Sequence, residues 1–511
     1  MEDSFKKIIS HCKEYGFVFQ SSEIYDGLAA VYDYGQNGVM LKNHLRQYWW
    51  KSMVQLHQNI VGIDSAIFMH PKTWKASGHI DGFNDPLIDN KDSKKRYRAD
   101  VLIEDYIENK IEKKIQKEIE KAKKRFGQNF DLEEFLRTNP NVLRNQEKKK
   151  AINEKLKNGL ETNDLQIVRQ LIIDLEIACP ISGTKNWTEV KQFNLMYSTQ
   201  MNATESNEAL YLRPETAQGI FLNYLNVQKT GRMKLPFGIA QTGKAFRNEI
   251  IARQFIMRMK EFEQMEMQFF VKPGEQKEWF EYWKKTRLNW HTNLGTPKDK
   301  YRFHEHTKLA HYADAAVDIE YQFPFGFKEV EGIHSRTDFD LSQHQSHSGK
   351  KIQYFDSISE KSQVPYVIET SIGLDRLFLL TISENLKTET LPNREQRNVL
   401  CLPPALAPNQ LAILPLLKKD GMPEMGKKIF DELKFEFNCY FEDKDSIGKR
   451  YRRQDAIGTP YCITIDHESI EQDTVTLRDR DTLHQERISI SELKSRLTDK
   501  LSLAKLLEKL E

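Results

Sequence analysis

The chain has 511 residues, of which 39% are hydrophobic, 11% aromatic and 29% charged. This composition predicts a globular protein of two or three domains and excludes a disordered one. The formal net charge is only +2, so a nucleic-acid partner would require basic residues to cluster locally. No apolar run reaches the roughly 18 residues of a membrane span, and the first segment lacks a signal or transit character, so we expect a cytoplasmic protein.

The first part of the chain, residues 1–103, is predicted to mix helices and strands. One helix in it carries an apolar stripe at spacings of three or four residues, formed by Leu41, Leu45, Trp49, Met53 and Leu56. Such a stripe indicates either a core helix or a helix at a dimer interface.

Residues 104–178 differ sharply in composition, because they are rich in lysine and glutamate and poor in aromatic residues. Charge pairs four residues apart predict an inserted helical module. Two interpretations stay open, a solvated helical hairpin and a module that contacts a nucleic-acid backbone.

Strand-like segments dominate residues 179–391, with hairpin-length connections and no regular alternation with helices. They predict an antiparallel sheet, and with the flanking helices an α+β fold. The proline-rich stretch Leu391–Pro408 is interpreted as a linker. Residues 392–511 then predict a smaller α/β domain.

The stretch Phe246–Phe270 combines arginines, carboxylates and aromatic rings at unusual density. Strand alternation would put a set of cationic, aromatic and acidic side chains on one face: Arg258, Lys260, Phe262, Gln264 and Glu266. Cations suit phosphates, a ring suits a base, and a carboxylate suits an amine, so this face fits ATP beside an amino acid. The alternative is a solvated hairpin held by cross-strand ion pairs.

Four glutamates stand in suggestive contexts: Glu215, Glu249, Glu266 and Glu369. Several acids around one cavity can hold a primary ammonium or a divalent metal, and each can equally form a structural ion pair. Arg247 and Arg376 are the leading candidates for phosphate contacts, since a guanidinium matches phosphate oxygens with two donors.

Metal-ligating patterns are weak elsewhere in the sequence. The histidines lack the HExxH spacing of a helical zinc site, and we expect packing or surface roles for them: His304, His306, His311, His344 and His347. The cysteines contain no CxxC pair, which argues against a disulfide framework and a cysteine-rich zinc site.

Several separated motifs resemble one known family when they are taken in order. YDYGQNGVMLKNHLRQYWW, FRNE with EFEQME, and IETSIGLDR resemble the three motifs of class II aminoacyl-tRNA synthetases. YLRPETAQGIF, PFGIAQTGKAFRNEI and EVEGIHSRTDFDL resemble the dimeric, single-chain glycyl-tRNA synthetases, and IGKRYRRQDAIGTPYCITID resembles their anticodon-binding domain. The resemblance covers nearly the whole chain. It implies a homodimer that attaches glycine to tRNA with ATP and Mg²⁺, through glycyl adenylate.

The resemblance also implies roles for particular residues. Arg247 and Arg376 would be catalytic and hold the α- and γ-phosphates, Glu249 would bind the adenine amino group, and Phe262 would stack on adenine. The full implied ATP set is Arg247, Asn248, Glu249, Met257, Arg258, Met259, Lys260, Glu261, Phe262, Glu329, Val330, Gly373, Leu374, Asp375 and Arg376. The implied glycine set is Arg98, Glu215, Phe262, Glu263, Gln264, Met265, Glu266, Glu369, Thr370, Ser371, Ile372 and Gly373. Glu329 would also hold Mg²⁺ through ATP.

Three positions depart from the family pattern. Lys260 stands where relatives usually have arginine, Thr370 replaces a common proline, and Cys179 stands where relatives often have a cysteine pair. We therefore expect no zinc. In the KRYRR cluster, Lys449, Arg450, Arg452 and Arg453 are the predicted contacts with the tRNA backbone, with a structural basic helix face as the alternative.

Overall fold

The structure is a computed structural model that describes residues 2–127, 130–200, 209–249, 254–306, 309, 313–390 and 396–510. It divides into two compact units. The first comprises Met1–Ser77, Tyr197–Arg247 and Ala252–Glu511, and the second comprises Gly78–Met196 with Asn248–Ile251. Within the described ranges, no helix is both long enough and apolar enough to cross a membrane.

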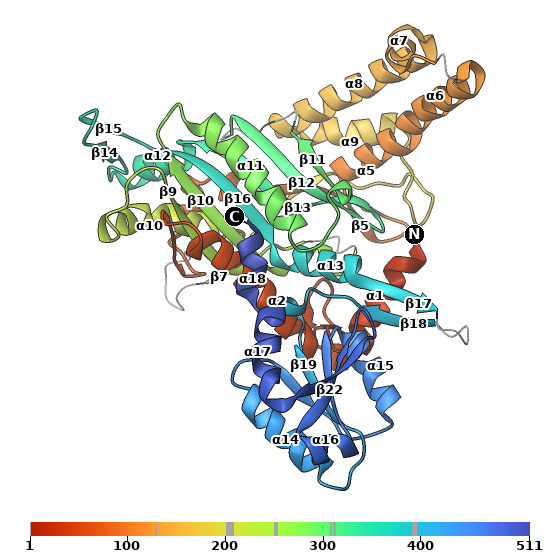
Figure 1. Cartoon of the computed structure of the whole chain (residues 1–511). Coiled ribbons are helices and arrows are strands. Elements are labelled where there is room, and N and C mark those ends of the chain that lie inside the picture. The colour runs from red at the N-terminus through yellow and green to blue at the C-terminus, as the bar shows by residue number, and fades with distance from the viewer. Residues whose placement is uncertain are drawn as a thin grey trace. The chain divides into compact units, whose positions relative to one another are not determined.

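A seven-stranded sheet organises the first unit (Figure 1). Its order is β11, β12, β13, β16, β10, β9 and β3, and every neighbouring pair is antiparallel except β9 with β3. The strands span Ile60–Gly62 (β3), Phe237–Phe246 (β9), Glu261–Val271 (β10), Tyr301–Glu305 (β11), Ala315–Phe323 (β12), Gly326–Thr337 (β13) and Tyr366–Gly373 (β16). The α+β class and the antiparallel sheet predicted from the sequence are confirmed.

Strand β10 shows why the sheet has one apolar and one polar face. Met265, Met267 and Phe269 alternate along it and are almost completely buried in the main core. Gln264 and Glu266 lie between them on the opposite face, because successive strand side chains point to opposite sides. The predicted face of Phe262, Gln264 and Glu266 is therefore present, whereas Arg258 and Lys260 precede the first residue of the strand.

Three helices contribute to the core on the apolar side of the sheet: α2 (Gln36–Trp50), α11 (Gln276–Thr292) and α13 (Leu374–Asn385). Helix α11 lies across the sheet in Figure 1 and supplies the buried Trp283 and Trp290. In α2, Leu41, Leu45 and Trp49 are fully buried in the same core. The apolar stripe is thus a core stripe, and it does not form a surface for a second subunit.

Helices α10 (Ala217–Thr230) and α12 (Phe339–Ser348) contact each other, and they pack with the far end of the sheet in a separate apolar cluster. The short helix α3 (Pro71–Ala76) contacts α12. Around the seven-stranded sheet, the other α-helix and strands are α1 (Glu2–Glu14), β1 (Val18–Gln20), β2 (Tyr32–Tyr34), β7 (Ser198–Gln200), β8 (Ala209–Tyr211), β14 (Tyr354–Asp356) and β15 (Lys361–Gln363).

A second sheet forms the C-terminal part of the first unit, in the order β20, β19, β21, β22, β23. Strand β19 pairs in parallel with β20 and β21, and the remaining pairs are antiparallel. These strands span Leu411–Pro415 (β19), Cys439–Phe441 (β20), Tyr461–Ile465 (β21), Thr474–Asp479 (β22) and Gln485–Ser489 (β23). The helices are α14 (Met422–Leu433), α15 (Ile447–Ile457), α16 (His467–Gln472), α17 (Ile490–Leu501) and α18 (Leu503–Leu507). The predicted C-terminal α/β domain is confirmed.

The predicted linker needs a correction. Gln396–Leu400 forms strand β18, which pairs antiparallel with β17 (Leu386–Thr390). Val399 and Leu400 are fully buried, so their apolar side chains hold this segment in the fold despite the neighbouring prolines. Residues 391–395 of the predicted linker lie outside the described residues.

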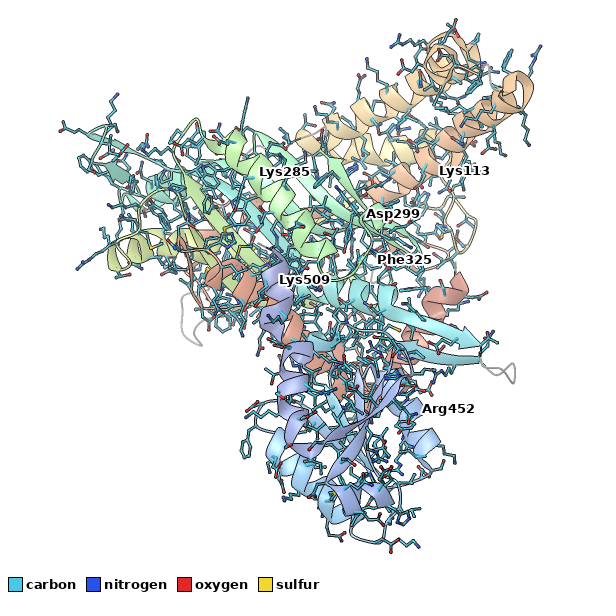
Figure 2. The ribbon with its side chains drawn as sticks, in the orientation of Figure 1. Lys113, Lys285, Asp299, Phe325, Arg452 and Lys509 are labelled. Carbon is cyan, nitrogen blue, oxygen red and sulfur yellow. The ribbon has the colours of Figure 1, made fainter. Side chains whose placement is uncertain are left out.

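The second unit combines a small sheet with charged helices. Its sheet has the order β5, β4, β6, formed by Asn84–Asn90 (β4), Lys95–Arg98 (β5) and Lys191–Asn194 (β6). The helices are α4 (His79–Gly82), α5 (Ala99–Tyr106), α6 (Lys113–Phe126), α7 (Leu132–Thr138), α8 (Pro140–Glu161) and α9 (Leu165–Asp174). Buried aliphatic residues such as Ile107, Ile152 and Leu171 form its core. Helix α6 presents basic side chains such as Lys113 (Figure 2). The four domain boundaries expected from composition stay predictions.

Candidate active site

Two buried glutamates lie on adjacent strands of the polar sheet face. Glu266 on β10 and Glu369 on β16 are 2% and 4% exposed. Gln268 lies directly opposite Glu369 and donates from Nε2 to Glu369 Oε2 at 2.7 Å and to Glu266 Oε1 at 3.4 Å. The Thr216 hydroxyl donates to Glu266 Oε2. Glu215 precedes Thr216 on the segment that enters α10, so three acids meet here.

The pKa values of the two buried glutamates move in opposite directions. Burial, together with repulsion from Glu369 and Glu215, raises the pKa of Glu266 well above its usual range. Burial alone would also raise the pKa of Glu369, but Arg336 and His334 outweigh it and hold that pKa below its usual range. The pair therefore favours one ionised carboxylate beside one protonated carboxyl, as expected for like charges that share a site.

Arg336 on β13 holds the ionised member in place. Its Nη1 donates to Glu369 Oε2 at 3.1 Å, while Nε and Nη2 donate to both oxygens of Asp340 at 2.8 and 3.0 Å. The guanidinium also lies over the Phe221 ring, at 5.6 Å from its centroid. All of Arg336, Asp340 and Glu369 are buried, so this fork fixes Glu369 rigidly.

Gln218 on α10 extends the network to Glu215. Its Nε2 donates to Glu215 Oε1 and to Asp340 Oδ1, both at 3.0 Å. Because the amide nitrogen faces both carboxyl groups, Gln218 Oε1 is left as the acceptor for another donor. His344 Nε2, 2.8 Å away, therefore donates to Gln218 Oε1.

Arg247 and Phe262 form a cationic and aromatic platform beside the carboxylates. The Arg247 guanidinium carbon lies 5.2 Å from the Phe262 ring centroid, within the range of a cation–π contact. Arg247 Nε donates to the Pro214 carbonyl at 3.0 Å, and its backbone N–H donates to the Lys260 carbonyl at 2.9 Å. These bonds fix the end of β9 against the segment that enters β10.

Arg376, near the start of α13, pairs with Glu329 on β13. Their Nη1 and Oε2 atoms are 3.0 Å apart, and the Glu329 side chain is 46% exposed. The positive charge of Arg376 lowers the pKa of Glu329. Burial and repulsion from Glu329 raise the pKa of the neighbouring Asp318. A bulge in the pairing of β12 with β13 lies at this position, since the register shifts between Ile319 and Glu320.

Two other acids of the predicted site contact a different set of residues. Glu263 accepts from Arg46 Nε and Nη2 at 2.5 and 2.9 Å, and its backbone N–H donates to Asp375 Oδ2 at 2.8 Å. Asp375 Oδ1 accepts from Lys42 at 2.7 Å and from the Tyr34 hydroxyl at 2.5 Å. These contacts form a buried ion cluster between β10, α13 and α2.

Three further predicted site residues belong to the second unit: Arg98, Asn248 and Glu249. Arg98 forms ion pairs with Asp85 at 3.0 Å and with Asp100 at 2.6 Å. Burial opposes the charge of Arg98, but Asp100, Asp85 and Glu249 raise its pKa overall. Arg98 and Glu249 are therefore electrostatic neighbours within this unit.

No group of three or more His, Cys, Asp or Glu residues could hold a metal ion in the parts of the chain that are described. His344 is committed to Gln218, and His306 pairs with Asp318 at 2.9 Å. Cys179 accepts from Ser93 and Tyr97 at 3.3 and 3.2 Å if those hydroxyls donate. His311 lies outside the described residues.

Comparisons with known proteins decide the family. Family profiles match residues 85–195 as glycyl-tRNA synthetase insertion domain 1, residues 197–385 as the class II tRNA synthetase core domain (G, H, P, S and T), and residues 410–500 as an anticodon binding domain. A glycine–tRNA ligase of Chlorobaculum tepidum is 48% identical over 97% of this chain and 99% of its own length. The glycine–tRNA ligase of Macrococcus caseolyticus is 48% identical over 98% and 99%, and that of Staphylococcus saprophyticus is 47% identical over 98% and 100%.

The chain belongs to the glycyl-tRNA synthetase family. The resemblance found in the sequence is thereby confirmed over nearly its full length. The profile matches also fit the described fold, because the class II core match spans the antiparallel strands from β7 to β16 and the anticodon-binding match spans the C-terminal sheet.

The structure places the site residues implied by the family resemblance in several different surroundings. The acids Glu215, Glu266 and Glu369 meet, with Gln264 donating to Ser371 at 3.3 Å on the same face. The side chains on the apolar or ion-cluster side of the first unit are Met257, Met259, Glu263, Met265, Val330, Thr370, Ile372, Leu374 and Asp375. Glu261 pairs instead with Lys244 at 2.5 Å near the surface. Contacts of all these residues with glycine or ATP stay predictions.

Sequence reasoning missed the residues that support the acids. Arg336, His334, Asp340 and Gln268 were not predicted individually, although all but Gln268 lie in the segment EVEGIHSRTDFDL that resembles this family. That segment was the available signal. Gln268 needed the pairing register of β10 with β16, which the sequence alone does not provide.

The basic helix α15 is mostly structural. Arg450 is 1% exposed and donates to the carbonyls of Pro415, Glu442 and Leu416. Arg453 pairs with Glu442. The predicted tRNA contact is thus wrong for Arg450, because its guanidinium is buried. Arg452 lies on the surface of this helix (Figure 2).

Proposed function

We propose that this protein attaches glycine to tRNA in two steps at the site around Glu266 and Glu369. A glycine carboxylate oxygen attacks the α-phosphorus of ATP, and pyrophosphate leaves with glycyl adenylate remaining. The terminal ribose hydroxyl of the tRNA then attacks the acyl carbon, and AMP leaves. No protein nucleophile is required, so catalysis would come from positioning and charge stabilisation.

The observation that carries the proposal is the buried pair of glutamates bridged by Gln268, with Arg336 bonded to one member only and Glu215 beside the pair. We assign the ammonium group of glycine to Glu266, Glu369 and Glu215. A cation there would favour ionisation of Glu266, and an ammonium would donate charge-assisted hydrogen bonds to both carboxylates. Glycine is the smallest amino acid, so crowded side chains that leave no room for a β-carbon suffice for selectivity. We therefore expect no editing of mischarged tRNA.

The platform of Arg247 and Phe262 supports an assignment of ATP next to the carboxylates. The ring of Phe262 would stack on adenine, and Arg247 would contact the α-phosphate. Arg376 would contact the γ-phosphate, and its ion pair with Glu329 would then break or be shared with the phosphate. Arg258 would add a further positive charge. Glu249 stays the predicted partner of the adenine amino group. Preorganised guanidinium groups of this kind stabilise charge that develops in the transition state.

Glu329 fits the metal that the family chemistry implies. Its ionised, half-exposed carboxylate offers the oxygen ligands that Mg²⁺ prefers. Mg²⁺ bound there with the phosphates would supply charge neutralisation on the leaving pyrophosphate. Glu329 would thus hold the ion while Arg376 orients the phosphate chain.

A homodimer is supported by a surface loop of this chain. Ile24, Tyr25 and Leu28 are 87%, 79% and 53% exposed, and adjacent exposed apolar side chains indicate an interaction surface. The same loop continues to Ala30, whose carbonyl accepts from the Lys260 backbone N–H at 2.9 Å. We infer that a second copy covers this loop and thereby fixes the segment that leads into β10. The cytoplasmic location expected from the sequence stays a prediction.

ATP–pyrophosphate exchange with each of the twenty amino acids tests the proposal. Exchange with glycine alone is the expected result. Exchange with a larger amino acid would contradict the assignment of the crowded carboxylates to glycine. Absence of exchange with every amino acid would contradict the activation step itself and favour a tRNA-binding role without catalysis.

A further inference from the structure

A cavity of about 540 Å³ lies between α3, α10 and α12, on the outer side of the helices that cover the far end of the sheet. Each of three chain segments contributes a lysine to its wall: Lys72 from α3, Lys229 from α10, and Lys350 from the turn after α12. His70 and His347 line it as well. No aspartate or glutamate belongs to this described lining.

The three lysines of the cavity have no carboxylate partner among the described residues. Across the described residues, no ion pair involves Lys72, Lys229 or Lys350, whereas Lys185 and Lys272 each have a carboxylate partner at 2.9 Å. Convergent cations without counter-charges raise the local concentration of anions. The lining therefore favours a ligand with several negative charges.

Apolar side chains form the rest of the cavity wall. Leu222, Leu225 and Ile352 lie between the cations, and Leu222 is 42% exposed although it is a large aliphatic residue. Small-molecule sites combine such apolar walls with a few charged groups, and volumes of roughly 300–1,000 Å³ are typical of them. A ligand that matches this wall carries an apolar organic group together with phosphates.

We propose that this cavity is a second binding site, for a phosphorylated small molecule of nucleotide size. The organic group packs against Leu222 and Ile352, and the phosphates contact the three lysines. None of these residues belongs to the candidate active site, which uses the sheet face below α10 and α12. Its ligand is therefore bound in addition to the ATP of the reaction.

The second site is connected to the glycine carboxylates by two hydrogen bonds. His344 belongs to the cavity wall and donates to Gln218, and Gln218 donates to Glu215. Burial lowers the pKa of His344, and an anion in the cavity opposes this effect by favouring its protonated form, which donates more strongly to Gln218. The ligand is expected to change the affinity for glycine, and this consequence rests on the proposed function. By linkage, glycine changes the affinity for the ligand by the same factor.

Lysine footprinting of the full-length protein tests the binding site directly. The protein is treated with an amine-acetylating reagent with and without ADP or inorganic triphosphate, and modified lysines are quantified by mass spectrometry. Protection of Lys72, Lys229 and Lys350 is expected, while the exposed neighbours Lys234 and Lys351 keep their reactivity. Protection confined to Lys260 would overturn the proposal, because only the candidate active site would then bind. Protection by RNA but not by either small phosphate would also overturn it, in favour of a nucleic-acid surface.

Matched variants provide the quantitative test. The triple variant Lys72→Ser, Lys229→Ser, Lys350→Ser is expected to weaken ADP binding at this site by roughly tenfold per lysine. The control Lys234→Ser, Lys351→Ser keeps the wild-type affinity, and an equal loss in both would overturn the assignment. The coupling is tested in glycine-dependent exchange at increasing concentrations of inorganic triphosphate. The glycine KM of the wild type is expected to shift, and that of the triple variant is not. An unchanged glycine KM in the wild type overturns the coupling between the two sites. Absence of any exchange contradicts the proposed function, and the second site is then tested by lysine footprinting alone.

Discussion

Glu266 and Glu369 are linked by one Gln268 amide, yet burial and neighbours move their pKa values in opposite directions. The difference arises because Arg336 bonds directly to Glu369, whereas Glu266 receives only neutral donors. Among the described residues, Arg213 and Arg336 act on Glu266 electrostatically but do not outweigh its burial and the repulsion from the other acids. This asymmetry supports our proposal that the site binds a cationic group of the size of a primary ammonium.

Replacement of Glu266 by glutamine is expected to raise the Tm of the ligand-free protein more at pH 8 than at pH 5. Unfolded glutamate ionises near pH ~4.3, but folded Glu266 keeps its proton to a higher pH. Above pH ~4.3 the folded state then binds more protons than the unfolded state, so stability falls as pH rises until the folded pKa is passed. Glutamine removes this loss. Equal Tm shifts at both pH values would contradict the raised pKa of Glu266. The control is Glu261→Gln at the surface.

Arg336→Lys is expected to raise the glycine KM by about tenfold or more, with a smaller change in the ATP KM. Lysine keeps the charge but cannot donate to Asp340 and Glu369 in the same planar geometry. Steady-state exchange kinetics measure both constants. The control is Arg302→Lys, because Arg302 pairs with Glu320 while being 52% exposed. Equal effects of both variants would show that Arg336 has no specific role at the carboxylates.

Arg376→Gln is expected to lower kcat for exchange by roughly 10²–10³-fold, the usual cost of removing one preorganised group that stabilises transition-state charge. Its guanidinium lies at the end of the proposed phosphate path and already orients Glu329 at 3.0 Å. Lys328→Gln, at the exposed residue before Glu329, is the matched control. A variant that raises only the KM for ATP would assign Arg376 to binding alone.

Replacing Arg450 and Arg452 of α15 one at a time should distinguish a role in stability from a role in tRNA binding. Arg450→Ala is expected to lower the free energy of unfolding by about 2–4 kcal/mol, because three carbonyl acceptors lose their buried donor. Arg452→Ala should lower the Tm less than Arg450→Ala, weaken tRNA binding and reduce its salt dependence by about one phosphate contact. Thermal unfolding and tRNA binding at several salt concentrations measure both effects. Loss of tRNA binding in Arg450→Ala without a lower Tm would contradict the structural role.

Ile24→Asp is expected to shift the protein from dimer to monomer and to lower exchange activity with it. A charge at an 87% exposed position costs little in the monomer, but it is unfavourable inside an apolar interface. Analytical ultracentrifugation gives the mass. Phe435→Asp is the matched control, since Phe435 is 83% exposed in the C-terminal part. A monomeric wild type, or a dimer that tolerates the aspartate, would exclude this loop as the interface.

Several features of this protein could be predicted because they depend on local periodicity or composition. Alternation along residues 262–266 put Phe262, Gln264 and Glu266 on one face, and β10 has that arrangement. The same rule puts Glu263 on the other side, where the structure pairs it with Arg46. The stripe around Leu45 predicted a buried helix face, but core and interface helices share this pattern, so only packing distinguished them.

The sequence by itself determined the α+β class, the family motifs and the three acids that meet at the candidate site. Only the tertiary structure decided which cations support these acids, because Arg336 reaches Glu369 through strand register and not through sequence spacing. It also decided that Arg450 is buried in α15. The opposite pKa shifts of Glu266 and Glu369 depend on burial and on distances between strands, and neither quantity is contained in a local pattern of residues.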